Sequence, residues 1–292
     1  MRDFLRYTVT QFERADLVYG HGTETALDEA AFLILSELSL PIDQLEPWLD
    51  ARLTMRERQS LLDLIETRIV TRKPAPYLIG QAFIQGYRFH VDEGVIVPRS
   101  FLGELLAGGL EAVVDDADDI GRVLDLCTGS GCLAIIAADQ FPHADVVATD
   151  ISDAALAAAR KNVEAYDLAG RVTLQKADLF DGLDPKHRFD LIVCNPPYVR
   201  SGAVSDFPPE YAAEPALAHD GGQDGLDLVH RVLANAADFL TQDGILVVEI
   251  GQERDAVEAH YPGVGFWWLD TAASSGEVFA VRAADLSDIK AA

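Results

Sequence analysis

The first quarter of the chain has the apolar spacing of amphipathic helices. Apolar residues recur three and four positions apart behind Thr25 and again near Leu61, and two prolines separate the two stretches. This period places apolar side chains on one helix face, and Thr25 is of the type that caps helix starts. Residues 1–75 are therefore predicted to form a small helical bundle. With no cluster of nucleophiles or phosphate-binding glycines there, we expect a role in recognition or packing.

The next segment, residues 76–99, changes to short apolar stretches separated by Gly86 and Gly94. Such stretches bounded by glycine are typical of β-strands. We expect a β-hairpin linker between two domains. The stretches that predict strands are 82–84, 87–91 and 95–97.

Residues 100–292 alternate between strand patterns and helix patterns, beginning with a helix that Ser100 is expected to cap. This alternation predicts an α/β fold with a doubly wound sheet. Ligands of such sheets bind outside the carboxyl ends of the strands, so the residues that follow each strand are the candidate site. Strands are predicted near 122–126, 145–149, 171–176, 189–194, 244–250, 263–270 and 277–283. Helices are predicted over 131–141, 152–166, 225–240 and 252–260.

Charge narrows the class of partner. The 292 residues include 48 Asp and Glu against 23 Lys and Arg, a formal net charge of -25. A surface this acidic repels phosphate backbones, so DNA binding is not expected, whereas a basic protein would be attracted. Acidity of this kind also serves solubility alone. The sequence leaves the oligomeric state open.

Other composition features predict an ordinary cytoplasmic enzyme. The three cysteines are an odd number without metal spacing or a disulfide framework, which favours core residues in a reducing compartment. No apolar run has the form of a signal peptide or a membrane span, so we expect no membrane partner. The seven histidines show no paired metal spacing on a predicted helix face, and no metal is expected.

The turn after the first predicted strand is rich in glycine. It reads Asp125-Leu126-Cys127-Thr128-Gly129-Ser130-Gly131 and leads into a predicted helix. Glycines let the backbone bend sharply and approach a ligand, and the free amides of a helix start attract anionic groups. The same residues also satisfy a dinucleotide fingerprint, so this loop alone is compatible with a nicotinamide or flavin enzyme.

Two carboxylates follow the next two strands. Asp150 can accept hydrogen bonds from both hydroxyls of a ribose, or it can cap the helix predicted to start near Ser152. Asp178 and Leu179 would lie where an adenine amino group and its ring could bind. The nicotinamide interpretation weakens at the fourth strand, because no partner for hydride transfer is evident there.

The fourth predicted strand ends in Asn195-Pro196-Pro197-Tyr198. The Asn195 side chain and the Pro196 carbonyl offer two fixed acceptors, and Tyr198 can cover a flat group bound between them. A planar NH₂ group could donate one hydrogen to each acceptor, which suits methyl transfer to an amide or an aromatic amine. The alternative is a proline-stiffened loop without a ligand.

Taken in order, these motifs resemble class I S-adenosylmethionine-dependent methyltransferases that act on amino groups. With the helical front end, the hairpin, Gly221 to Leu226 and Glu249-Ile250-Gly251, nearly the whole chain is similar to the protein-(glutamine-N5) methyltransferases. The resemblance implies a Rossmann-like fold over residues 100–292, S-adenosylmethionine as methyl donor, and catalysis by Asn195, Pro196 and Tyr198, with Pro197 completing the substrate-binding turn. The cosubstrate-binding residues that it implies are Asp125, Cys127, Thr128, Gly129, Ser130, Gly131, Asp150, Asp178, Leu179 and Asn195.

Two branches of this family differ after the hairpin. The release-factor branch reads Pro-Arg-Pro-Asp-Thr-Glu, whereas this chain has Pro98-Arg99-Ser100-Phe101, which is closer to the ribosomal-protein branch. The ribosomal-protein branch is also favoured by residues 19–23 and by Cys127 and Cys132. One departure from this branch is Phe101, which replaces an expected proline. The implied substrate is a glutamine in the basic third protein of the large ribosomal subunit.

Three alternatives remain at this point. The first is the same reaction on peptide chain release factors. The second is N(6)-adenine methylation of nucleic acid, which the charge argues against. The third is a non-catalytic ribosome-assembly protein that retains the fold.

Overall fold

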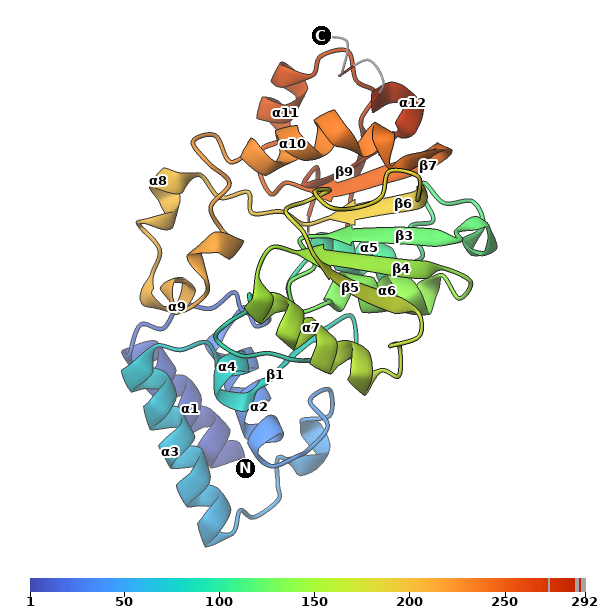
Figure 1. Cartoon of the computed structure of the whole chain (residues 1–292). Helices are drawn as coiled ribbons and strands as arrows, with labels where there is room; N and C mark the ends of the chain where they lie inside the picture. The colour runs from blue at the N-terminus through green and yellow to red at the C-terminus, as the bar shows by residue number, and fades with distance from the viewer. Residues whose placement is uncertain (273, 287–288, 290–292) are drawn as a thin grey trace.

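The computed structural model describes residues 1–272, 274–286 and 289, and its largest element is a seven-stranded sheet (Figure 1). The strand order is β5-β4-β3-β6-β7-β9-β8; β5 to β7 are parallel, while β9 is antiparallel to both β7 and β8. This confirms the predicted doubly wound sheet. The strands are β3 (Arg122–Leu126), β4 (Asp145–Asp150), β5 (Val172–Lys176), β6 (Phe189–Cys194), β7 (Leu240–Glu249), β8 (Trp267–Leu269) and β9 (Val278–Arg282).

The order of the strands fixes where a ligand can bind. The chain progresses outward from β3 through β4 to β5, and then returns to the other side of β3 to begin again with β6. The direction of winding therefore reverses between β3 and β6. Ligands of open α/β sheets bind in the crevice at such a reversal, beyond the carboxyl ends of the strands.

Helices cover both faces of the sheet, and neighbouring residues of one strand serve opposite cores. Val123 belongs to the core packed under α6, whereas Leu124 belongs to the core packed under α10. This follows from the alternation of side chains along a strand. The helices of this part are α5 (Phe101–Ala107), α6 (Cys132–Gln140), α7 (Asp153–Ala165), α10 (Asp227–Asn235), α11 (Arg254–His260) and α12 (Ala283–Leu286).

The front of the chain is helical, as predicted. Thr25 accepts a hydrogen bond from the Asp28 amide at the start of α2, and Thr54 and Glu57 form a reciprocal cap on α3. Both caps satisfy amides that have no partner within the helix. The helices are α1 (Arg2–Arg14), α2 (Ala26–Glu37), α3 (Met55–Thr71) and α4 (Ala75–Ile79).

The hairpin consists of two strands, β1 (Gln81–Ile84) and β2 (Tyr87–His90), joined by Gln85 and Gly86. Both turn residues have positive φ, of 49° and 82°, as a two-residue turn matched to the strand twist requires. The third predicted stretch, residues 95–97, is not a strand. Its backbone bonds to side chains instead: the Val95 carbonyl accepts the Tyr77 hydroxyl, and the Val97 amide donates to Glu214.

Several predicted boundaries near the end of the chain were wrong. The predicted helix 225–240 starts only at Asp227, because Gly225 has a φ of 82°, and it ends at Asn235 before a short 3-10 turn. The strand predicted over 263–270 is reduced to β8, because a tight bond from the Phe266 amide to the Val264 carbonyl bends the chain. β7 begins four residues earlier than predicted, at Leu240.

In Figure 1 the segment between β6 and α10 lies to the left of the sheet, above the front helices. It contains α8 (Ser201–Val204) and α9 (Pro209–Ala212), followed by a 3-10 turn at Ala216–Ala218. We call residues 201–220 the strap. Across the described residues, no helix combines the length and the hydropathy that a bilayer crossing requires.

Candidate active site

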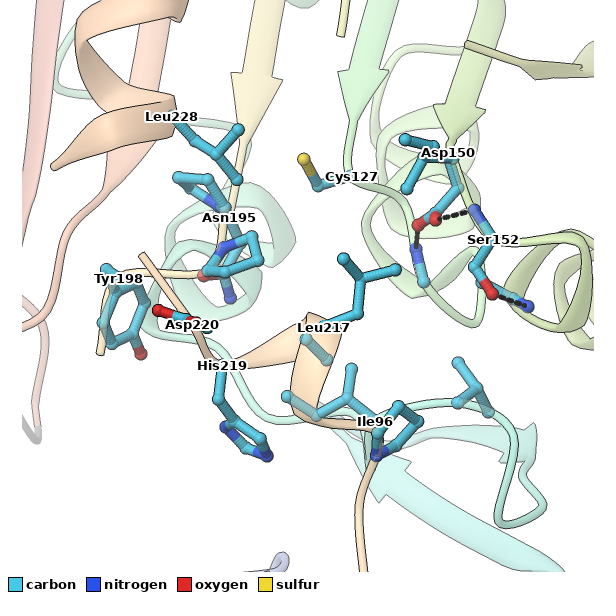
Figure 2. Close-up of a pocket in the computed structure, with 18 of the residues that line it drawn as sticks. Ile96, Cys127, Asp150, Ser152, Asn195, Tyr198, Leu217, His219, Asp220 and Leu228 are labelled. Atoms are coloured by element: carbon cyan, nitrogen blue, oxygen red, sulfur yellow. Dashed lines mark hydrogen bonds between the residues drawn. The ribbon is translucent and has the colours of Figure 1, made fainter. Parts of the chain in front are cut away.

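A cavity of about 850 Å³ opens at the carboxyl ends of the parallel strands, a size typical of small-molecule sites. Cys127 and Asp150 lie on one side of it and Asn195 and Tyr198 on the other (Figure 2). Most residues that the sequence singled out line this cavity. They are Cys127, Thr128, Gly129, Ser130, Asp150, Asp178, Leu179, Asn195, Pro196, Pro197 and Tyr198.

Asp125 and Gly131 do not line the cavity. Asp125 is fully buried behind the loop, where one of its oxygens accepts the Thr128 hydroxyl at 2.5 Å and the Ala134 amide at 3.0 Å. Burial raises the pKa of Asp125 to about 7, because removal from water disfavours the charged form. Asp125 therefore fixes the loop to the start of α6 and has no direct access to a ligand.

Gly131 explains why the loop needs a glycine at its end. Its φ is 80°, and a Cβ there would lie 3.1 Å from the Ala159 Cβ and 3.3 Å from the Ala159 Cα. Any side chain would push α7 away from the loop. Cys127 also has a positive φ, of 58°, so the turn bends sharply at both ends and presents its backbone to the cavity.

Asp150 is half-buried at the end of β4, and both of its oxygens accept backbone amides. The Gly129 amide donates at 2.9 Å and the Ser152 amide at 2.8 Å (Figure 2). The helix cap is Ser152 itself, which accepts the Ala155 amide, so the cap interpretation of Asp150 does not hold. Each carboxylate oxygen keeps a second lone pair that can accept a ligand hydroxyl. Burial raises the pKa of Asp150, while its two amide donors act in the opposite direction.

Asp178 lies at the rim of the cavity with a partner that the sequence did not predict. Arg231 of α10 pairs with it at 3.0 Å and also lines the cavity. Leu179 is buried and has a φ of 55°, which turns the chain after β5 so that the carboxylate and the apolar side chain both reach the site. The spacing of 53 positions between Asp178 and Arg231 gives no local signal in the sequence.

The turn after β6 keeps its two acceptors free. Among the described residues, none donates a hydrogen bond to the Asn195 side chain or to the Pro196 carbonyl, although both residues line the cavity. Polar groups in a partly buried site are usually paired. Two unpaired acceptors on consecutive residues of a proline-stiffened turn are available to a donor that carries two hydrogens.

Tyr198 is held in place from the end of β7. Its hydroxyl donates to Glu249 at 3.1 Å, and the second oxygen of Glu249 accepts the Ser100 hydroxyl and the Leu102 amide. Gly251, with a φ of 57°, lies against the ring: a Cβ there would be 2.8 Å from a Tyr198 ring carbon. Burial, and then the Glu249 charge, raise the pKa of Tyr198. Glu249 and Gly251 thus fix the position of the ring.

The strap is anchored by a buried carboxylate, Glu214. It forms a bidentate pair with Arg99 at 2.6 and 2.7 Å and accepts the Val97 amide, and the imidazoles of His219 and His21 lie 3.1 and 3.5 Å from it. Burial alone would raise its pKa, but the Arg99 and histidine partners outweigh burial and lower the pKa well below its ordinary range.

A second buried carboxylate, Glu210, joins the strap to the helical front end. Glu210 accepts the Val18 amide and pairs with Arg72 at 2.8 Å, and it lies 3.8 Å from the buried Arg68. Nothing in the sequence singled out Glu210, because its partners lie far away in the chain. The strap contributes Tyr211, Pro215 and Leu217 to the wall of the cavity, and Glu210 bonds this wall to Val18 and Arg72.

Comparison with known proteins shows the family of this chain. A family model, the methyltransferase small domain, matches residues 104–207. Proteins named ribosomal protein uL3 glutamine methyltransferase are similar over nearly the full length: that of Burkholderia pseudomallei is 49% identical over 98% of this chain and 95% of its own, and that of Bordetella pertussis 51% over 95% and 93%. The relative from Bradyrhizobium diazoefficiens is 50% identical over 97% of this chain and 91% of its own.

A solved structure supports the fold alone. The catalytic domain of hMettl16, determined in complex with a MAT2A 3'UTR hairpin, superposes with a TM-score of 0.52 at 15% identity. The alignment covers 78% of this chain and 82% of that domain. The sheet described above is therefore an arrangement found in a catalytic domain of very different sequence.

Proposed function

Because the chain belongs to the family of ribosomal protein uL3 glutamine methyltransferases, we propose that it methylates the side-chain amide nitrogen of a glutamine in ribosomal protein uL3, with S-adenosylmethionine as methyl donor. The ribosomal-protein branch predicted from the residues around Pro98 is confirmed by relatives about half identical to the chain. One observation carries the chemistry. A single cavity contains both the glycine-rich loop of residues 127–130, which we call the cradle, and the two unpaired acceptors after β6.

The cradle side of the cavity would hold the cosubstrate. Asp150 would accept the ribose hydroxyls through its remaining lone pairs, and Asp178 and Leu179 would contact the adenine. The backbone of residues 127–130, which lines the cavity, would approach the amino acid part. When bound, S-adenosylmethionine supplies an electrophilic methyl group whose bond to sulfur breaks as the new bond to nitrogen forms. Asp125 and Gly131 act on this side through the shape of the loop.

The opposite side would hold the glutamine amide. An amide nitrogen is a poor nucleophile, so orientation has to contribute much of the catalysis. Asn195 and the Pro196 carbonyl would each accept one amide hydrogen. These two hydrogen bonds increase the electron density on the nitrogen and aim it into the cavity. The nitrogen forms its bond to the methyl carbon and releases one proton to solvent. No separate general base is needed, because methylation makes that proton acidic.

Tyr198 would cover the plane of the amide. Its ring has little freedom, because Glu249 holds the hydroxyl and Gly251 closes the space beside the ring. Such preorganisation saves the cost of arranging the site during reaction. Glu249 is thus a positioning residue that acts through Tyr198.

The front helices, residues 1–75, together with the strap, are the part of the chain that we assign to recognition of the protein substrate. Glu210 and Glu214 bond this part to the rim of the cavity. The net charge of -25 suits a basic ribosomal protein and opposes nucleic acid, which argues against adenine methylation.

The decisive experiment is transfer of labelled methyl groups to unmethylated uL3 by the parent protein and by Asn195→Ala. We expect turnover to fall by about 10²-fold or more, as for the loss of other oriented hydrogen-bonding groups, while S-adenosylmethionine affinity changes little. Gln242→Ala, which removes an exposed amide at the far end of β7 from the cavity, serves as the control and should retain full activity.

Mass spectrometry of the product should find one added methyl group on a glutamine of uL3. Turnover of Asn195→Ala near the parent level would remove Asn195 from catalysis. Methylation of release factors in place of uL3 would show that the substrate assignment is wrong.

A further inference from the structure

A group of metal-ligating side chains lies outside the cavity, where the loop before α10 meets α10 and α11. One ligand atom from each of Asp224, His230 and His260 lies within 4.8 Å of the other two. The two helices are neighbours (Figure 1), and the two imidazole centroids are 5.0 Å apart. No spacing in the sequence predicts this group, because its members come from a loop and two separate helices.

The hydrogen bonds around these side chains leave the right atoms available. The Nδ1 of His260 bonds to the Ala256 carbonyl at 2.8 Å, and since a carbonyl only accepts, Nδ1 carries the proton and Nε2 keeps the lone pair of the neutral ring. The Nδ1 of His230 bonds to the Tyr261 hydroxyl at 2.7 Å. Metal-bound histidines nearly always have such a partner on the other ring nitrogen.

Asp224 is oriented in the same way. Its Oδ1 accepts the Leu226 amide at 3.0 Å, and its Oδ2 lies 3.7 Å from the Nε2 of His230. Among the described residues, no lysine or arginine pairs with Asp224, so its charge is not already neutralised by a salt bridge. One oxygen is thus fixed by the backbone, and the other faces the imidazoles.

We propose that Asp224, His230 and His260 bind a divalent first-row transition metal, with Zn²⁺ as the representative ion. Two imidazoles and one carboxylate favour such an ion over Ca²⁺ and Mg²⁺, which prefer all-oxygen sites. Zinc bonds of about 2.0–2.2 Å would bring the ligand atoms to about 3.5 Å apart. The present separations need closing by little more than about 1 Å, which rotation of the exposed His260 side chain supplies.

The position of the site indicates what the ion would do. Asp224 lies in the loop Gly221 to Gly225, which packs against the backbone of the catalytic turn: a Cβ on Gly225 would lie 2.5 Å from the Tyr198 carbonyl oxygen. The helix that carries His260 begins three residues after Gly251, which lies against the Tyr198 ring. A bound ion would therefore tie together three segments behind Tyr198 and stiffen that wall, without contact with the reacting atoms.

Zinc titration of the full chain tests the site directly, by calorimetry and with Co²⁺ absorption as a report on the ligands. We expect one Zn²⁺ per chain, with affinity weakened by at least about 100-fold in His260→Asn and in Asp224→Asn, because removal of a ligand should cost no less than removal of a group that only orients a ligand. Zinc at a hundredfold excess over its Kd should raise the Tm by about 5 °C, and this rise should disappear in both variants.

Two controls separate this site from other zinc ligands. His143→Asn removes an exposed histidine that lies beside Asp118, and Cys127→Ser removes a thiol that lines the cavity; neither should alter zinc binding. Absence of saturable binding, or equal binding by the parent and the Asp224 and His260 variants, overturns the proposal. None of these readouts depends on methyl transfer, so the result stands apart from the proposed function.

Discussion

The two sides of the cavity are assembled in different ways. On the cradle side, the bonds span shorter stretches of chain: Asp125 bonds to groups 3 and 9 positions away, Asp150 to an amide 21 positions away, and Asp178 to Arg231, 53 positions away. On the strap side, Glu214 accepts an amide 117 positions away and Glu210 one 192 positions away. The first side is held mainly by backbone conformation and local bonds, and the second by buried charges.

This difference teaches that each side can be disturbed without the other. A change in a buried ion pair of the strap should affect stability and protein substrate before it affects the cosubstrate. A change in the cradle should do the reverse. The variants below test that separation, beginning with the largest effect.

Glu214→Ala should destabilise the strap. The substitution leaves Arg99 and the Val97 amide without their partner, and removal of one member of a buried pair costs about 3–5 kcal/mol of unfolding free energy. Urea unfolding measures this loss, and kcat/KM for uL3 should fall with it. Calorimetry at a temperature where the variant is folded should find S-adenosylmethionine affinity unchanged.

The matched control is Glu93→Ala, which removes a carboxylate paired with Lys73 where both side chains are exposed. Exposed pairs contribute little, so its unfolding curve should stay close to that of the parent. If Glu214→Ala lost cosubstrate affinity as strongly as activity on uL3, the two sides would not be separable.

Asp125→Asn tests the cradle side, where the pKa of the buried carboxylate is raised, whereas the pKa of Glu214 on the strap side is lowered. The pKa of Asp125 is 3.8 when unperturbed and about 7 in the folded protein, so between these values the folded state binds more protons than the unfolded state. This group therefore lowers stability as pH rises from about 4 to 7, and its effect is constant above pH 7. The stability of the variant relative to the parent should improve across that interval, by up to about 4 kcal/mol.

Unfolding curves of both proteins at a series of pH values measure this difference. Any constant offset from the new amide is irrelevant, because only the slope reports the titration. Glu214 has the reverse sign: its lowered pKa adds stability above its ordinary value of 4.5, and that stability is lost as pH falls below it. Parallel curves for the parent and Asp125→Asn would contradict the raised pKa.

Gly251→Ala should have the smallest effect on stability, and it should act on the position of the Tyr198 ring. A Cβ at a φ of 57° costs about 1–2 kcal/mol, and it would contact the Tyr198 ring at 2.8 Å. We expect methyl transfer to slow by about tenfold, because a displaced ring no longer covers the amide. Gly263→Ala, where no atom lies within 4 Å of the added Cβ, should leave kinetics and thermal unfolding nearly unchanged. Equal kinetics for both variants would show that Tyr198 tolerates displacement.

The sequence predicted what depends on local pattern. The alternation of strands and helices located the sheet, and glycines and prolines at strand ends located the cradle and the turn after β6. The cap residues Thr25 and Ser100 were also predicted, since capping depends on neighbours three positions away. In each case the physical cause and its consequence lie within a few residues.

The rest depends on partners that only the fold brings together. Residues 95–97 have the pattern of a strand, yet the Val97 amide bonds to Glu214 rather than to another strand. Glu210 is an acidic residue between prolines, and nothing beside it in the chain indicates that Arg72 will neutralise it in the interior. Arg231 became a partner of Asp178 for the same reason.

The attachment of Glu210 to Arg72 and to the Val18 amide also bears on how such proteins can be recombined. An exchange of front ends between family members at the hairpin would separate α9 from the front helices of its own protein. A working chimera would have to transplant the strap together with residues 1–75, although some 125 positions lie between the two pieces. Lineages that changed their target protein would then have had to alter both pieces in step.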